Sequence, residues 1–196
     1  MPTITERELV LEFLDGWQVV QYDRQANSKT GEPASFYRRI IEQGGVTHVR
    51  GVDIICRLPG LPERLEFIEI KDDRKRTMKA GPRHAELFTT VLQKTAGTLA
   101  GLVLAERLGE ESLRPHACLS QNPTIEVILL LVEPAPVPVQ AVSGENNLRR
   151  LAERQGKTTL EQRLNAKLEE WGLRFALYNL SNRPAPDWQV RDLSQP

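Results

Sequence analysis

The chain of 196 residues carries 26 basic and 26 acidic residues, and 40% of its residues are hydrophobic. This composition is typical of a globular protein with a buried core, and it excludes a protein that binds nucleic acid through its net charge alone. Two cysteines, Cys56 and Cys118, exclude a disulfide framework and indicate a reducing, cytoplasmic location. The N-terminus lacks the pattern of a signal peptide, and the longest apolar run, 127–132, is too short to span a bilayer, so no membrane association is expected.

The N-terminal part of the chain predicts a helix, a strand and a second, short helix. Thr5 and Glu8 form a capping-box pattern that predicts a helix over 5–14. The aromatic and β-branched residues of 17–22 predict the first strand, and a polar loop follows it. Residues 36–43 are predicted as a short helix that ends at two glycines.

Three more strands and a long helix are predicted next. The strands at 48–58 and 64–71 are joined by a short proline-containing connection, which favours an antiparallel hairpin. Apolar residues recur at helical spacing over 83–108, and small residues at 96, 97, 100 and 101 would allow this helix to approach its sheet closely. The apolar run 124–133 is typical of a central strand that is covered on both faces. The order helix, three strands, helix, strand predicts an α/β fold with a mixed sheet flanked by helices.

A proline-rich stretch at 134–140 separates a predicted core, residues 1–140, from a C-terminal segment, residues 141–196. This segment is predicted to contain two helices, at 146–155 and 159–171, and strands at 173–180 and 188–191. It either packs on the core, with 173–180 as a fifth strand, or forms a small winged-helix-like module that places a helix in the major groove of DNA. The turn between the two helices does not match DNA-reading helices, so the first interpretation is favoured.

Charged residues gather where the second and third predicted strands would meet. Asp53 stands at the start of the second strand, and Glu69 and Lys71 share one face of the third because side chains alternate along a strand. An antiparallel hairpin would bring all three to one edge of the sheet. The carboxylates of Asp53 and Glu69, with the carbonyl of Ile70, form a donor set suited to Mg²⁺. Mg²⁺ would stabilise charge on a phosphodiester and activate water, while Lys71 would contact the phosphate or orient that water.

The sequence contains GVD, then fifteen residues, then EIK, within this order of elements. This pattern resembles the PD-(D/E)xK, or restriction-endonuclease-like, nuclease superfamily. The resemblance implies the superfamily's fold, Mg²⁺- or Mn²⁺-dependent cleavage of DNA, and Asp53, Glu69 and Lys71 as catalytic positions. Gly51-Val52 stands where the superfamily's name has proline, a position that varies among members. Members often add a glutamate from the first helix. Glu12 is preferred for this role over Glu8, because it borders the predicted inward face. A homodimer would supply the two sites needed to cut both strands.

Basic residues follow the predicted site directly. The cluster consists of Lys75, Arg76, Lys79 and Arg83. It either binds the phosphate backbone of DNA or is a solvated loop, as most charge runs are. The pair Gln93-Lys94 on the long helix is expected to face solvent rather than the site, and the three histidines show no zinc-like spacing.

Two other functions fit the same pattern. The first is a non-catalytic DNA-binding or assembly protein with a nuclease-like fold, in which Glu69 and Lys71 are a surface pair of little energetic consequence. The second is a hydrolase that acts on another phosphate ester, such as a nucleotide. The predicted function is a metal-dependent endonuclease that acts on DNA.

Overall fold

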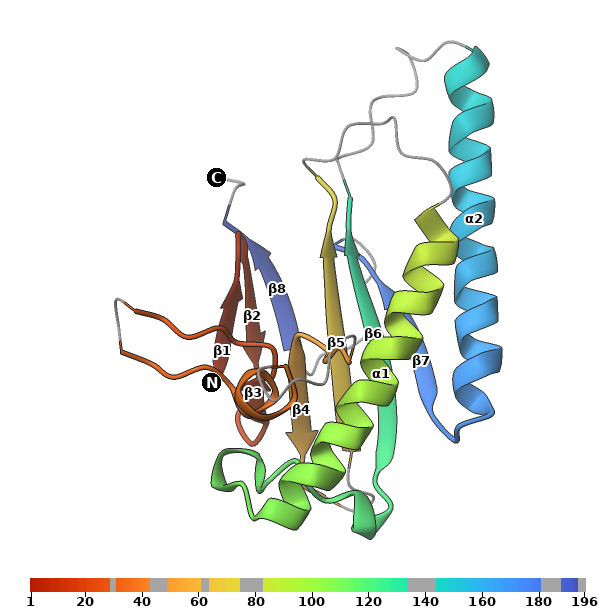
Figure 1. The fold of residues 1–196 in the computed structure, drawn as a ribbon. Coiled ribbons are helices and arrows are strands. Elements are labelled where there is room, and N and C mark those ends of the chain that lie inside the picture. Colours follow the sequence, from red (N-terminus) through yellow and green to blue (C-terminus); the bar gives the residue numbers. More distant parts are fainter. Residues whose placement is uncertain are drawn as a thin grey trace.

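The computed structural model describes residues 1–28, 31–42, 49–60, 64–74, 83–133, 144–180 and 188–193. They form a mixed α/β structure with two sheets (Figure 1). The larger sheet contains, in spatial order, β3 (Gln18–Gln21), β4 (Ile54–Leu58), β5 (Arg64–Asp72), β6 (Thr124–Val132) and β7 (Arg174–Tyr178). The smaller sheet contains β1 (Thr3–Glu6), β2 (Leu9–Phe13) and β8 (Trp188–Asp192) in that order. The helices are α1 (Arg83–Leu108), α2 (Gly144–Glu169), a π-helical turn at Tyr37–Glu42 and 3-10 turns at Glu111–Leu113 and Leu119–Gln121.

The larger sheet combines an antiparallel half with a parallel half. β3, β4 and β5 pair antiparallel in sequence order. β6 pairs parallel to β5 and β7 pairs parallel to β6, so α1 and α2 are the crossover connections that parallel neighbours require. The predicted hairpin of the second and third strands, the long helix and the strand at 124–133 are therefore confirmed.

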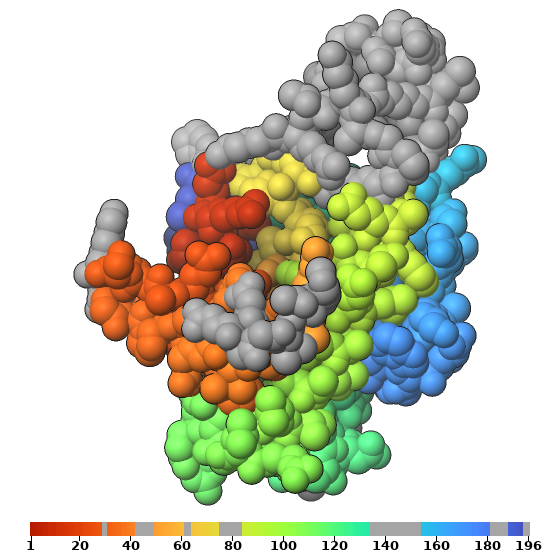
Figure 2. Space-filling view, viewed as in Figure 1, coloured from red at the N-terminus to blue at the C-terminus, as the bar shows by residue number. Residues whose placement is uncertain are grey.

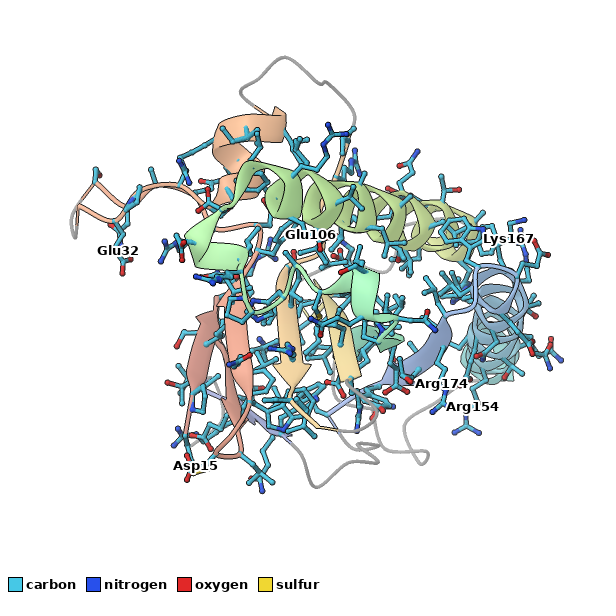
Figure 3. The ribbon with its side chains drawn as sticks, turned by 90° about the horizontal axis from the view of Figure 1, so that it is seen from below. Asp15, Glu32, Glu106, Arg154, Lys167 and Arg174 are labelled. Carbon is cyan, nitrogen blue, oxygen red and sulfur yellow. The ribbon has the colours of Figure 1, made fainter. Side chains whose placement is uncertain are left out.

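Each face of the larger sheet is covered by a different layer. α1 and α2 lie over one face and the smaller sheet lies over the other (Figure 3). Along β5 the side chains alternate between the layers: Leu65 and Phe67 pack with the helices, whereas Ile68 and Ile70 pack with the smaller sheet. Glu69, two residues after Phe67, consequently belongs to the helix side.

The prediction of a helix over 5–14 is wrong, because these residues form the β1–β2 hairpin. Arg7 makes the turn with a left-handed backbone, φ 56°. Leu9, Leu11 and Phe13 are fully buried, because β2 lies between β1 and β8 and faces the larger sheet. Pairing with strands on both sides outweighs the local capping signal at Thr5 and Glu8.

The strand predicted over 48–58 begins only at Ile54, and Val49 and Val52 before it bond to other elements. The Val52 N–H donates to Thr98 Oγ1 of α1 at 3.0 Å, and the Tyr37 hydroxyl donates to the Val49 carbonyl at 2.6 Å. A Cβ on Gly97 would lie 2.2 Å from the Arg50 carbonyl oxygen. Glycine at 97 thus permits a close approach of α1 to the segment before β4 rather than to the sheet, and the alanines at 96 and 100 face solvent.

The break predicted between two C-terminal helices is also wrong, because α2 continues through it. Gly156, at the expected turn, lies against the ring of His84, where a Cβ would come within 2.4 Å of Cε1. It is a site of close packing between α2 and α1. Residues 174–178 join the larger sheet as its fifth strand, and β8 pairs with β2.

The helix α1 also has the length and apolar composition of a membrane-spanning segment over His84–Leu108. Its side chains Leu87, Val91 and Leu102 are buried in the core beneath it. Packing in the core accounts for part of this composition, since 44% of the apolar window is buried.

Candidate functional site

Asp53, Glu69 and Lys71 meet at the edge where β4 begins and β5 ends. The Asp53 N–H donates to the Ile68 carbonyl at 3.1 Å, which extends the β4–β5 ladder by one residue. The Ile70 N–H donates to Asp53 Oδ2 at 2.7 Å, which holds the carboxylate beside β5. Lys71 Nζ lies 2.7 Å from Glu69 Oε1. The hairpin therefore brings two carboxylates and one ammonium together, as the spacing predicts.

A second lysine, Lys94 of α1, completes the cluster. Its Nζ donates to Glu69 Oε2 at 2.6 Å and to Asp53 Oδ1 at 3.2 Å, so the ammonium bridges the two carboxylates. The solvent-facing position expected for Lys94 is wrong, since the residue is only 8% exposed. Its neighbour Gln93 does face solvent. One turn of α1 thus places a buried cation directly over the strand edge.

Burial and paired charges determine the protonation of this cluster. Burial raises the pKa of Glu69, the charge of Asp53 raises it further, and Lys94 and Lys71 oppose the rise without cancelling it. Burial alone would lower the pKa of Lys94, but the charges of Glu69 and Asp53 raise it above its usual value. Lys94 is therefore an ammonium at neutral pH.

Asp53, Lys71 and Lys94 line a polar cleft of about 540 Å³, whereas Glu69 is fully buried and does not line it. Figure 2 shows the hollow between the N-terminal segments, β5 and α1. Glu32, another lining residue, lies on an arm that projects from the body (Figure 3). Charged side chains that line the cleft outside the cluster are Glu6, Arg7, Asp23, Arg24, Glu32, Arg38 and Asp72. The cleft therefore offers cationic side chains near the carboxylates of the strand edge.

The donor set fits the Mg²⁺ that the resemblance implies. Mg²⁺ is usually held by one or two carboxylates and keeps several of its waters. Asp53, which lines the cleft, and the buried Glu69 supply two carboxylates, and Glu69 Oε1 lies 2.7 Å from the Lys71 ammonium. Within the residues that the structure describes, no group of three or more Asp, Glu, His or Cys side chains is arranged to hold a metal ion. The fit therefore rests on two carboxylates, and a contribution from the Ile70 carbonyl stays a prediction.

Glu12, the other predicted acidic residue, lies apart from this cluster. The predicted helix that was to carry it is strand β2, where Glu12 forms an ion pair with Arg191 of β8. Glu6 of β1 lines the cleft instead, and its Oε2 accepts a hydrogen bond from Gln21 Nε2 at 2.8 Å. The alternation of TITE was the signal for a strand that could have identified Glu6.

The predicted phosphate-binding residues cannot be placed in the same way. Lys75, Arg76 and Lys79 lie outside the described residues. Arg83 is the first residue of α1, and its backbone alone is described.

Comparisons with known proteins add no relative. No protein-family model, curated protein or solved structure matches the chain.

Proposed function

We propose that the chain is a metal-dependent endonuclease of the PD-(D/E)xK type that hydrolyses phosphodiester bonds in DNA. The observation that carries the proposal is the convergence of Asp53, Glu69 and Lys71 at the edge of a polar cleft. The framework around them supports it. Three antiparallel strands, a crossover helix and a parallel strand follow one another in the order expected for that superfamily. The departure is at the N-terminus, where a hairpin stands in place of the expected first helix.

Each residue of the cluster has a distinct role in this proposal. Asp53, fixed by the Ile70 N–H, and the buried Glu69 would hold the cation. Mg²⁺ bound there, or Mn²⁺ in its place, supplies charge stabilisation at the scissile phosphate and activation of a water molecule. Lys71, with its side chain 31% exposed at the cleft, orients the attacking water and stabilises negative charge on the phosphate. Glu6 is the additional carboxylate, in the role expected of Glu12.

We assign the arginines of the cleft to a polyanionic substrate, for which Arg24 and Arg38 would exchange their ion pairs with Glu32 and Asp23. Arg7, Arg24 and Arg38 line the cleft around the acidic cluster, and arginine is well suited to phosphate because its guanidinium can donate two parallel hydrogen bonds. In this proposal these arginines position the DNA backbone over Asp53 and Lys71, and Lys75, Arg76, Lys79 and Arg83 extend the contact.

Incubation of the purified protein with supercoiled plasmid or single-stranded DNA tests the proposal. Reactions contain Mg²⁺, Mn²⁺ or EDTA, and DNA binding is measured separately in Ca²⁺. We expect cutting in Mg²⁺ or Mn²⁺ only, and loss of cutting in Asp53→Ala with DNA binding retained. Cutting in EDTA, or full activity of Asp53→Ala, would contradict the proposal. Nicking without linear product would indicate that one strand is cut at a time.

One observation favours a second function, a non-catalytic DNA-binding protein. Lys94 and Lys71 already pair with both carboxylates, so the cluster is neutral without any added cation. A protein of this kind would bind DNA equally well in Mg²⁺ and in EDTA, and would cut it in neither.

A further inference from the structure

Lys94 places a cation in contact with both acids of the cluster. Its Nζ is 2.6 Å from Glu69 Oε2 and 3.2 Å from Asp53 Oδ1. The bridge spans three elements, since Asp53 precedes β4, Glu69 belongs to β5 and Lys94 to α1. Two carboxylates so close together repel each other when both are ionised, and a buried ammonium between them offsets that repulsion.

A divalent cation held by the same carboxylates would have to share this position with the ammonium. The two carboxylates carry two negative charges, and Lys94 with Lys71 already supplies two positive ones. Adding two more positive charges within a few ångströms, in a partly buried site, is strongly unfavourable unless a lysine moves away. Lys94 is the residue that has to move, because its ammonium touches both acids, whereas Lys71 touches Glu69 alone of the two.

The surroundings allow that movement. Lysine has a flexible stem of four carbons, and Lys94 itself lines the cleft of about 540 Å³ together with Lys71. An ammonium that leaves the carboxylates can therefore enter the cleft without a shift of α1. Its new partner in the cleft would be an anion, and the phosphate of a bound DNA strand has the required charge.

We infer that Lys94 is an internal counter-ion: it holds Asp53 and Glu69 together in the metal-free protein and is displaced toward the substrate phosphate when a divalent cation binds. This inference rests on the proposed nuclease function. Its consequence is that Lys94 weakens cation binding in the absence of DNA. Bound DNA that accepts the displaced ammonium then strengthens cation binding. Because such coupling is reciprocal, the bound cation strengthens DNA binding by the same factor.

Mn²⁺ binding without DNA, measured by electron paramagnetic resonance or calorimetry, tests the inference independently of activity. The variants are Lys94→Met and, as a matched control on the same helix, Gln93→Met, whose side chain faces solvent. We expect Lys94→Met to bind Mn²⁺ at least about ten times more tightly than the wild type, a change of about 1.4 kcal/mol, and Gln93→Met to bind it like the wild type. Equal or weaker binding by Lys94→Met would overturn the inference.

A second variant and a second readout cover the case in which Lys94→Met does not fold without metal. Lys94→Gln keeps a hydrogen-bond donor for Glu69 and removes only the charge, and it is expected to bind Mn²⁺ more tightly as well. The rise in melting temperature on adding Mn²⁺ should be larger in both Lys94 variants than in the wild type, because only Lys71 then offsets the charges of the two carboxylates. An equal rise in all proteins would contradict the inference.

The two proposals fail in different ways. Metal-dependent cutting by the wild type together with unchanged Mn²⁺ affinity in Lys94→Met would leave the nuclease function standing and remove the role of Lys94. Tighter Mn²⁺ binding by the variant together with a wild type that never cuts DNA would support the counter-ion and contradict the nuclease.

Discussion

Glu66, on the face of β5 opposite to Glu69, couples the packing of the two sheets to pH. It is fully buried, accepts a hydrogen bond from Trp188 Nε1 of β8 at 2.9 Å and forms an ion pair with Arg64. Burial raises the pKa of Glu66 from 4.5 to about 7, although Arg64 and Trp188 favour the charged form. The difference between these two values corresponds to about 3 kcal/mol.

The sign of the effect follows from the direction of the pKa change. The folded chain binds this proton more tightly than the unfolded chain, so its contribution to stability is fully present below pH 4.5 and is lost as the pH rises through 7. Replacement Glu66→Gln removes the titration and retains an acceptor for Trp188. We therefore expect the free energy of unfolding of the wild type to fall by about 3 kcal/mol more than that of Glu66→Gln between pH 4.5 and pH 8.

Urea unfolding at half-unit pH steps, followed by tryptophan fluorescence, measures this difference. Other groups, Glu69 among them, contribute to the pH dependence of both proteins, so the informative quantity is the difference between the two curves. Curves that stay parallel over this pH range would refute the reasoning. A difference that grows with pH in favour of the wild type would refute it as well.

Two further predictions concern the framework of the site. Gly97→Ala would place a Cβ 2.2 Å from the Arg50 carbonyl oxygen, so we expect it to lower the free energy of unfolding by about 1–3 kcal/mol. The control Gly60→Ala, whose added Cβ meets no described atom within 4 Å, should change that free energy by less than about 1 kcal/mol. Similar urea midpoints for both variants would contradict the contact between α1 and residues 49–52. Glu6→Ala should slow plasmid cutting at least about tenfold, whereas Glu12→Ala, which removes only the outer pair with Arg191, should leave it unchanged; the reverse result would return the additional acidic role to Glu12.

The central juxtaposition could be predicted from the sequence because it depends on short-range geometry. A brief connection between two apolar runs specifies an antiparallel hairpin, and the alternation of side chains then places Glu69 and Lys71 on one face near Asp53. The long helix could be predicted equally well, because the helical spacing of its apolar residues extends over the whole of Arg83–Leu108.

The features that were missed depend on contacts between distant parts of the chain. Residues 9–13 form a strand because β8, almost at the other end of the chain, pairs with them, and no local pattern reports that partner. The position of Lys94 depends on the rotation of α1 about its axis, which the close contacts of Gly97 with Arg50 and of Gly101 with Tyr22 determine. The spacing of Lys94 from Leu87, Val91 and Leu102 was the signal that could have placed it on the buried face, because residues three, four, seven and eight apart share one side of a helix.

The loss of cutting in Lys71→Ala, measured beside Lys157→Ala, tests the central claim most directly. The two lysine side chains are equally exposed, at 31%, and each pairs with a glutamate, but Lys157 lies on α2 with Glu133 as its partner. We predict that Lys71→Ala abolishes Mg²⁺-dependent cutting of supercoiled plasmid while it still binds DNA in Ca²⁺, and that Lys157→Ala cuts like the wild type. Equal cutting by the two variants would contradict the assignment of this cluster as a nuclease site.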